Sequence, residues 1–286
     1  MSVQFLTQKD EPLFPDILWN RPTSIGRSGR LLIIGGHKHE FSQIQHIFEV
    51  AEASGIGEIK AAMPDSLRRL LPGLDAGFFL PSTQSGSIAR SALGELLHIA
   101  SDFDAIVIGA NITNNSETAI LIESIVRKAE LPIIITEEAI TILKFNPDLI
   151  TGNPNILVVS TMPGIFELAN NHHIPLAIKP NAGVVGKLQI IEQLVQISRC
   201  QYFVFDQEAI AAAEGKYSLT SLNHSASDAS SVPIGLASAF WIQNRSKPFD
   251  ALTTAAFILS AATNDPFNGV GELSKRIRAK LLELET

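Results

Sequence analysis

The chain has 286 residues, enough for one large domain or two small ones. Apolar residues make up 45% of it and charged residues 18%, a composition that can bury a sizeable core. The 22 basic and 29 acidic residues give a net charge of -7, which argues against a nucleic-acid partner and a polybasic membrane-surface protein. No apolar run approaches the ~20 residues that span a bilayer, the start has no signal-peptide pattern, and Cys200 is the one cysteine. We therefore expect a cytoplasmic protein with no membrane partner and no disulfide framework.

Short β-branched runs alternate with helical patterns through the first two thirds of the chain. Residues 1–28 are polar and proline-rich, and we expect them to be an arm laid on the domain, residues 29–286, or on a neighbouring subunit. The predicted strands are residues 31–34, 58–63, 105–108, 132–135 and 156–159, and the predicted helices are residues 41–54, 117–129, 137–143 and 188–197. Apolar runs separated by amphipathic helices are typical of a parallel sheet covered on both faces.

The last third of the chain changes character. Residues 202–205 and 209–213 are predicted to be edge strands, with a turn at Glu214-Gly215. Two alanine-rich helices are predicted at residues 233–243 and 248–262. Because no linker or repeat interrupts the body, the sequence predicts one α/β domain with a mainly parallel central sheet.

The chemistry is expected at the junctions where strands lead into helices. In an open α/β sheet, ligands collect beyond the carboxyl ends of the strands, where backbone amides and helix N-termini can hold anions. The junctions are Gly35-Gly36, residues 109–115, residues 160–164 and the serine-rich stretch before Pro233. None contains GxxxxGK[ST] or a GxGxxG that follows a strand, which excludes a P-loop NTPase and the usual dinucleotide fingerprint.

The order and spacing of these junctions resemble the ADP- or ATP-dependent NAD(P)H-hydrate dehydratases, a family of the ribokinase-like superfamily. Residues 29–36, a helix, Gly55-Ile-Gly57, a strand and Pro64 follow the family's opening pattern without a gap. The later counterparts are residues 108–113 for the GPGLG turn, 132–140 for a strand ending in DAD, 159–166 for TPHPGEF, 227–243 for the GTGD segment and its helix, and 248–251 for the PFEA helix start. The resemblance covers roughly residues 25–265.

This resemblance implies a three-layer α/β/α ribokinase-like fold and the conversion of NAD(P)H hydrate back to NADH or NADPH, driven by ATP or ADP with Mg²⁺. The glycines of GTGD let backbone amides approach phosphate oxygens at a helix N-terminus, and its aspartate acts as the base that activates the substrate hydroxyl. Carried over, it implies a nucleotide site at Gly109, Asn111, Ser227, Ser230 and Ser231, and a substrate pocket at Gly36, His37, Ser42, Met162 and Pro163.

A second candidate for anion binding is the stretch from Lys179 to Lys187, which carries two lysines and two glycines. It adds Asn181 and Gly183 to the expected nucleotide site. The alternative is a glycine-rich loop that leads into the helix at residues 188–197.

The departures from the family pattern fall on the functional positions. Alignment through Gly235 places Ser231 where the family has its catalytic aspartate, and a neutral hydroxyl cannot accept a proton as a carboxylate does. Asp228, three residues earlier, is the candidate catalytic base of this stretch if the loop is rebuilt. Further positions differ: Met162 replaces a histidine, Ile165 a glutamate, Thr136 the first aspartate of DAD, and Asn111 the second glycine of GPGLG. Ser42-Gln43 replaces the paired small residues after the first strand, which gives the pocket a bulkier floor. Glu138 keeps the last acid of DAD.

Three interpretations therefore stay open. The first is a divergent NAD(P)H-hydrate dehydratase with weakened or lost catalysis. The second is a non-catalytic nucleotide-binding or assembly module, and we expect a homo-oligomer because the apolar composition and the arm suit subunit packing. The third is a small-molecule kinase of the same superfamily, disfavoured by the same missing aspartate. We expect no metal ion held by protein ligands alone, since the cluster from His37 to Glu40 has no identifiable partners elsewhere.

Overall fold

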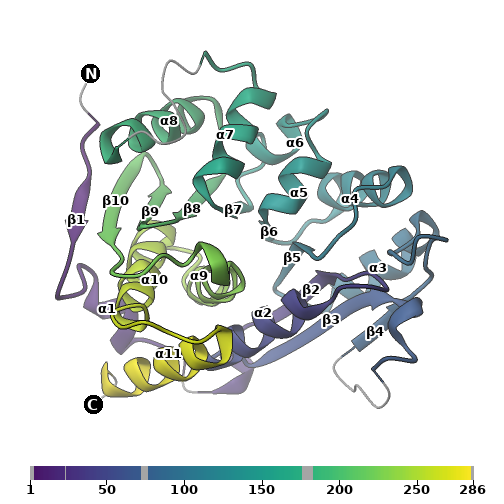
Figure 1. Ribbon diagram of the computed structural model, residues 1–286, viewed down its shortest axis with the longest axis horizontal. Helices are drawn as coiled ribbons and strands as arrows, with labels where there is room; N and C mark the ends of the chain where they lie inside the picture. Colours follow the sequence, from purple (N-terminus) through teal and green to yellow (C-terminus); the bar gives the residue numbers. More distant parts are fainter. Residues whose placement is uncertain (1–2, 23, 72–76, 176–182, 285–286) are drawn as a thin grey trace.

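A ten-stranded sheet runs through the molecule, with helices on both of its faces (Figure 1). The computed structural model describes residues 3–22, 24–71, 77–175 and 183–284. The strands lie in the order β1 (Leu6–Gln8), β10 (Lys216–Ser221), β9 (Glu208–Ala213), β8 (Gln201–Phe205), β7 (Ile156–Ser160), β6 (Ile133–Ile135), β5 (Ala105–Ala110), β2 (Arg30–Gly35), β3 (Glu58–Pro64) and β4 (Gly77–Leu80). Every described pairing is parallel except the two that β9 makes, with β8 and with β10.

The helices form two layers, one on each face of the sheet. One layer consists of α1 (Pro15–Trp19), α2 (Ser42–Ala53), α9 (Ser231–Gln243), α10 (Pro248–Ala262) and α11 (Val270–Leu284). The other consists of α3 (Leu93–Ala100), α4 (Ser116–Lys128), α5 (Glu137–Ile142), α6 (Asp148–Thr151), α7 (Met162–Asn171) and α8 (Val184–Ile197). The predicted three-layer α/β/α arrangement around a mainly parallel sheet is therefore confirmed.

Alternation along the strands creates two hydrophobic cores. On β2, Leu31 and Ile33 pack against the α9 layer, whereas Leu32 and Ile34 pack against the α4 layer. All four side chains are fully buried, as expected of a strand covered on both faces. Helix α9 is buried from Ser231 to Ile242 and packs against α2 and α10, so it is apolar around its whole circumference.

The prediction that residues 202–205 and 209–213 form edge strands is wrong. β8 lies between β7 and β9, and β9 lies between β8 and β10, so the sheet ends instead at β1 and β4. The predicted turn at Glu214-Gly215 is confirmed, with φ of 53° and 73°, and it brings β10 back along β9. β10 was not predicted from the sequence, and this strand supplies the neighbour that makes β9 an interior strand.

The N-terminal residues add the last strand to the sheet. β1 pairs in parallel with β10, and the Gln8 side chain, 1% exposed, donates to the Thr253 carbonyl oxygen at 2.8 Å and to Thr220 Oγ1 at 3.1 Å. Polar side chains with paired groups can be buried at little cost, which explains a glutamine in this position. No helix in the described part of the chain is long and apolar enough to cross a membrane.

A glycine is required where β2 meets β5. A methyl group at Gly35 would lie 2.0 Å from the Ala110 carbonyl oxygen, a backbone atom that cannot swing away. We predict that Gly35→Ala lowers the free energy of unfolding by about 1–3 kcal/mol, because the two strands must move apart. The matched control is Gly94→Ala on the exposed face of α3, where nothing lies within 4 Å and helix propensity gives a gain of up to ~1 kcal/mol. Urea denaturation of both variants measures the difference, and equal stabilities would refute this role of Gly35.

Candidate functional site

A cleft opens at the carboxyl ends of β2, β5, β6, β7 and β8. It contains two cavities of about 880 and 440 Å³ that share Gln43, Glu138 and Ser230 in their walls. The first is bounded by the start of α2, the turn before α9 and residues 266–270, and the second by residues 136–141, 159–161 and 227–234. This is the edge of the sheet at which the sequence predicts a ligand.

Six of the predicted site residues meet in this cleft. Those that line the first cavity are Ser42, Asn111, Asp228, Ser230 and Ser231, and those that line the second are Ser227 and Ser230. They come from three separate stretches of the chain, so the fold brings together predicted residues that lie far apart in the sequence.

Gly109 and Gly36, two of the predicted site residues, line neither cavity and pack closely against neighbouring segments. Gly109 has a φ of 114°, and a Cβ atom there would lie 1.9 Å from Thr136 Oγ1, which donates to the Gly109 carbonyl oxygen at 2.9 Å. Gly36 has a φ of 80°, and its N–H donates to the Ala110 carbonyl oxygen at 2.7 Å. Both positions need glycine, because a side chain would be strained at these φ values and would crowd its neighbours.

Besides Gly36, three residues predicted for the substrate pocket line neither cavity. Met162 is 2% exposed and packs in the core beneath α7, because its long apolar side chain is better placed there than in a polar cleft. Pro163 is exposed in the first turn of α7. His37 sits in a tight turn with Glu40, where partial burial lowers the pKa of its imidazole.

The glycine-rich candidate stretch is only partly described. Asn181 lies outside the described residues. Gly183 is the exposed N-cap of α8 and lines neither cavity. The helix begins at Val184, earlier than the predicted residue 188.

A reciprocal pair of hydrogen bonds joins α2 to the end of β5 at the centre of the cleft. The Gln43 N–H donates to Asn111 Oδ1, and the Asn111 N–H donates to Gln43 Oε1, both at 2.8 Å. Asn111 has a φ of 55°, a conformation that asparagine tolerates better than most residues with a side chain. The amide side chains therefore replace the open glycine turn that the family pattern has here.

Glu138 is the functional candidate that the sequence analysis left out of the site. It lies in both cavity walls, and its Oε2 accepts the Ile112 N–H at 2.9 Å. Burial raises the pKa of this carboxyl from 4.5 to about 7, so it changes charge near neutral pH. The sequence feature that could have identified Glu138 is an acidic residue at the start of a helix that follows a buried strand.

The neighbouring Glu137 forms the floor of the second cavity. Its Oε2 accepts from Ser160 Oγ at 3.5 Å, from the Thr161 N–H at 3.4 Å and from Thr161 Oγ1. These contacts hold the end of β7 against the start of α5. The second cavity therefore has a fixed polar floor.

The turn that matches GTGD has a different local structure from an open glycine loop. Residues Ser227–Ala229 form a 3₁₀ turn that runs directly into α9, and the Ala229 N–H donates to the Ala226 carbonyl oxygen at 3.1 Å. Ser231 is 4% exposed at the first position of α9, whereas Asp228 is exposed at the edge of the first cavity. The carboxylate and the helix start are therefore separated by a backbone turn.

The described cleft residues do not fit a nucleoside polyphosphate with its Mg²⁺. The walls contain the acids Glu40, Glu137, Glu138 and Asp228 and the histidines His46 and His224, but among the described residues no lysine or arginine. Within the same part of the chain, no group of three histidine, cysteine or acidic side chains can hold a metal ion. Phosphate oxygens need cationic or N–H donors, and three or more carboxylates nearby oppose them.

Comparison with known proteins supports the resemblance drawn from the sequence. No family model matches the chain. A bifunctional NAD(P)H-hydrate repair enzyme Nnr of Moorella thermoacetica is 26% identical over 142 residues, which are 49% of this chain and 27% of that protein. The matched part thus spans about a quarter of that relative.

Solved structures are similar over nearly the whole chain. A ribokinase-like superfamily protein from Enterococcus faecalis has a TM-score of 0.74 at 14% identity, with 98% of this chain and 97% of that chain covered. The ADP/ATP-dependent NAD(P)H-hydrate dehydratase from Bacillus subtilis, co-crystallized with ATP/Mg²⁺, has a TM-score of 0.65 at 16% identity, with 96% of both chains covered. The fold is therefore ribokinase-like. The predicted resemblance to the NAD(P)H-hydrate dehydratases is confirmed in both sequence and structure.

The raised pKa of Glu138 makes stability depend on pH. A carboxyl with a pKa of 4.5 when unfolded and about 7 when folded holds its proton more tightly in the native state, so stability falls as pH rises through this interval. We predict that Glu138→Gln removes this loss of stability, which is on the order of 3 kcal/mol in the free energy of unfolding. Urea denaturation at pH 5 and pH 8 measures it.

The control for this prediction is Glu95→Gln on the exposed side of α3. That variant should keep the pH dependence of the parent protein. A Glu138→Gln variant with the parent's pH dependence would contradict the assignment.

Proposed function

We propose that this chain is a non-catalytic relative of the NAD(P)H-hydrate dehydratases, which binds the base and sugar of a nucleotide-type ligand in its cleft. It does not carry out the ATP- or ADP-driven loss of water. The observation that carries the proposal is Ser231, a buried hydroxyl at the start of α9 where the family pattern has its aspartate. A hydroxyl with a pKa far above 7 does not serve as the base at neutral pH.

Asp228 does not replace the missing base in this proposal. It is exposed on the 3₁₀ turn that precedes α9, three residues before Ser231, although both residues line the first cavity. General base catalysis requires the carboxylate within hydrogen-bond reach of the hydroxyl that it activates. Moving Asp228 to the helix start would require unwinding the turn.

The cleft still suits a small ligand. The two cavities offer hydroxyl, amide and carboxyl groups from Ser42, Asn111, Thr161 and Glu138, which can hydrogen-bond to a ribose or to the edge of a base. A small-molecule kinase of the same superfamily is disfavoured, because phosphoryl transfer needs the same base and a held polyphosphate. In keeping with the sequence-based expectations, we propose that the protein acts in the cytoplasm as a homo-oligomer.

The absence of dehydration can be tested directly. We predict that the protein, incubated with NADH hydrate, Mg²⁺ and either ATP or ADP, regenerates NADH no faster than a solution without protein. Absorbance of the reduced nicotinamide follows the reaction, and the Moorella repair enzyme serves as the positive control. Turnover that is lost in Asp228→Asn would overturn the proposal.

The mode of binding gives a second prediction. By calorimetry, we expect adenosine and ATP to bind with dissociation constants within about threefold of each other, because no described cation pairs with the phosphates. Asp228→Asn should strengthen ATP binding alone, since it removes a negative charge from the cleft. The matched control is Asp102→Asn, which changes an exposed acid before the amino end of β5. This variant should change the affinity for neither adenosine nor ATP. An affinity for ATP that is tenfold or more higher than the affinity for adenosine would contradict the proposed mode of binding.

A further inference from the structure

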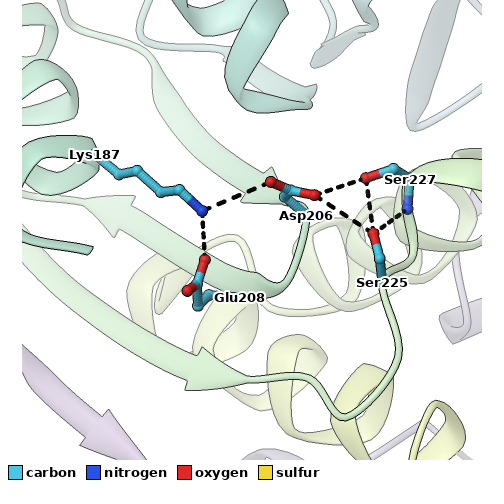
Figure 2. A network of polar contacts seen from close by, with 5 residues as sticks. All are labelled: Lys187, Asp206, Glu208, Ser225 and Ser227. Carbon is cyan, nitrogen blue, oxygen red and sulfur yellow. Dashed lines mark hydrogen bonds and ion pairs between the residues drawn. The ribbon is translucent and has the colours of Figure 1, made fainter. Parts of the chain in front are cut away.

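We infer that Lys187 is a positioning residue for the cleft: through Asp206 it fixes the turn of residues 225–231, which forms the wall between the two cavities. The inference rests on the proposed role of the cleft as a ligand site. Figure 2 shows the chain of contacts, which runs from α8 through the end of β8 to this turn.

The Lys187 ammonium is paired with two carboxylates inside the protein. The residue is 9% exposed, and its Nζ lies 2.6 Å from Glu208 Oε2 and 3.6 Å from Asp206 Oδ2 (Figure 2). A buried cation is costly unless carboxylates pair with it, so this geometry is strongly preferred. The ammonium is therefore not free to hold an anionic ligand, as the sequence analysis proposed for this stretch.

The second oxygen of Asp206 holds the turn. Asp206 Oδ1 accepts from Ser227 Oγ at 3.0 Å and from Ser225 Oγ at 3.4 Å (Figure 2), and the Asp206 carbonyl oxygen accepts the Ala226 N–H at 3.3 Å. Within the turn, Ser225 Oγ accepts the Ser227 N–H at 3.2 Å. One carboxylate thus joins a cation on one side to two hydroxyls and a backbone turn on the other, and hydrogen bonds to charged groups are stronger than neutral ones.

This turn determines the shape of the cleft. Ser225, Asp228 and Ser231 line the first cavity, Ser227 lines the second, and Ser230 lines both. Without Lys187, Asp206 Oδ2 would lose the cation that orients this carboxylate, so Asp206 Oδ1 would no longer be held toward the serines. Glu208, which only Gln207 separates from Asp206 in the chain, would lose its cation too, at a cost in stability. The position of the cleft wall therefore depends on a residue of α8 that lines neither cavity.

Hydrogen–deuterium exchange of the ligand-free full chain tests this inference. We predict that Lys187→Met makes the amides of residues 222–231 exchange at least tenfold faster, because Ala226, Ser227 and Ala229 lose the fixed turn. Lys187→Arg should restore slow exchange, since a guanidinium can pair with both carboxylates. Ser227→Ala, which leaves the ion pairs intact, should accelerate exchange in the same segment. Lys280→Met, which removes the surface pair with Glu283, should leave the segment unchanged.

A double variant separates positioning from a purely structural ion pair. In Lys187→Met with Glu208→Gln, the excess negative charge is gone, so the melting temperature should recover toward that of the parent while residues 222–231 still exchange at least tenfold faster. Slow exchange of this segment in Lys187→Met, or its recovery in the double variant, would overturn the inference. Because no ligand is used, failure of the proposed binding function leaves this result unaffected.

Discussion

The start of helix α9 is held in place by packing, and the chemistry of the cleft depends on that constraint. α9 is buried along its length between the sheet, α2 and α10, and at Gly235 a methyl group would lie 3.0 Å from the Ile47 carbonyl oxygen. A helix packed this closely cannot slide or rotate to present another side chain. Ser231 is therefore the group that the fold presents at the helix start, and Asp228 remains one backbone turn away.

The charge distribution around the cleft also argues against the nucleotide-driven dehydration. The described walls are acidic, and the buried lysine nearest to the turn is paired with Glu208 and Asp206. Burial raises the pKa of Glu138, one of the wall carboxyls, to about 7. A site of this kind favours a ligand with hydroxyl and amide groups over one with several phosphates. The likeness to an ATP/Mg²⁺-bound dehydratase is thus a likeness of fold.

The sequence predicted the interior of the sheet well and its margins poorly. Runs such as Leu31–Ile34 are readable because both faces of the strand are buried, so every residue is apolar. The sheet edges depend on β1, which pairs with a strand more than 200 residues away, and no local pattern encodes that contact. Helix α11 was missed although Leu273, Ile277 and Leu281 share one of its faces.

The same distinction applies to the cleft. The strand-end rule placed Asn111 and the 227–231 turn together, because it follows from topology, and the family resemblance added Ser42. It did not predict the Gln43–Asn111 pair or the Lys187–Asp206 contact, since each joins residues that lie far apart in the chain. Met162 was misplaced because the family motif gives a position in the chain but not the direction of a different side chain.

A crystal structure of the chain soaked with ADP, Mg²⁺ and NADH hydrate examines the central constraint most directly. We predict that residues 227–229 keep their 3₁₀ turn, that no phosphate binds at the start of α9, and that the Asp228 carboxylate points away from any bound ligand. A phosphate held by the amides of this turn, with the Asp228 carboxylate within hydrogen-bond distance of the hydrate hydroxyl, would contradict it.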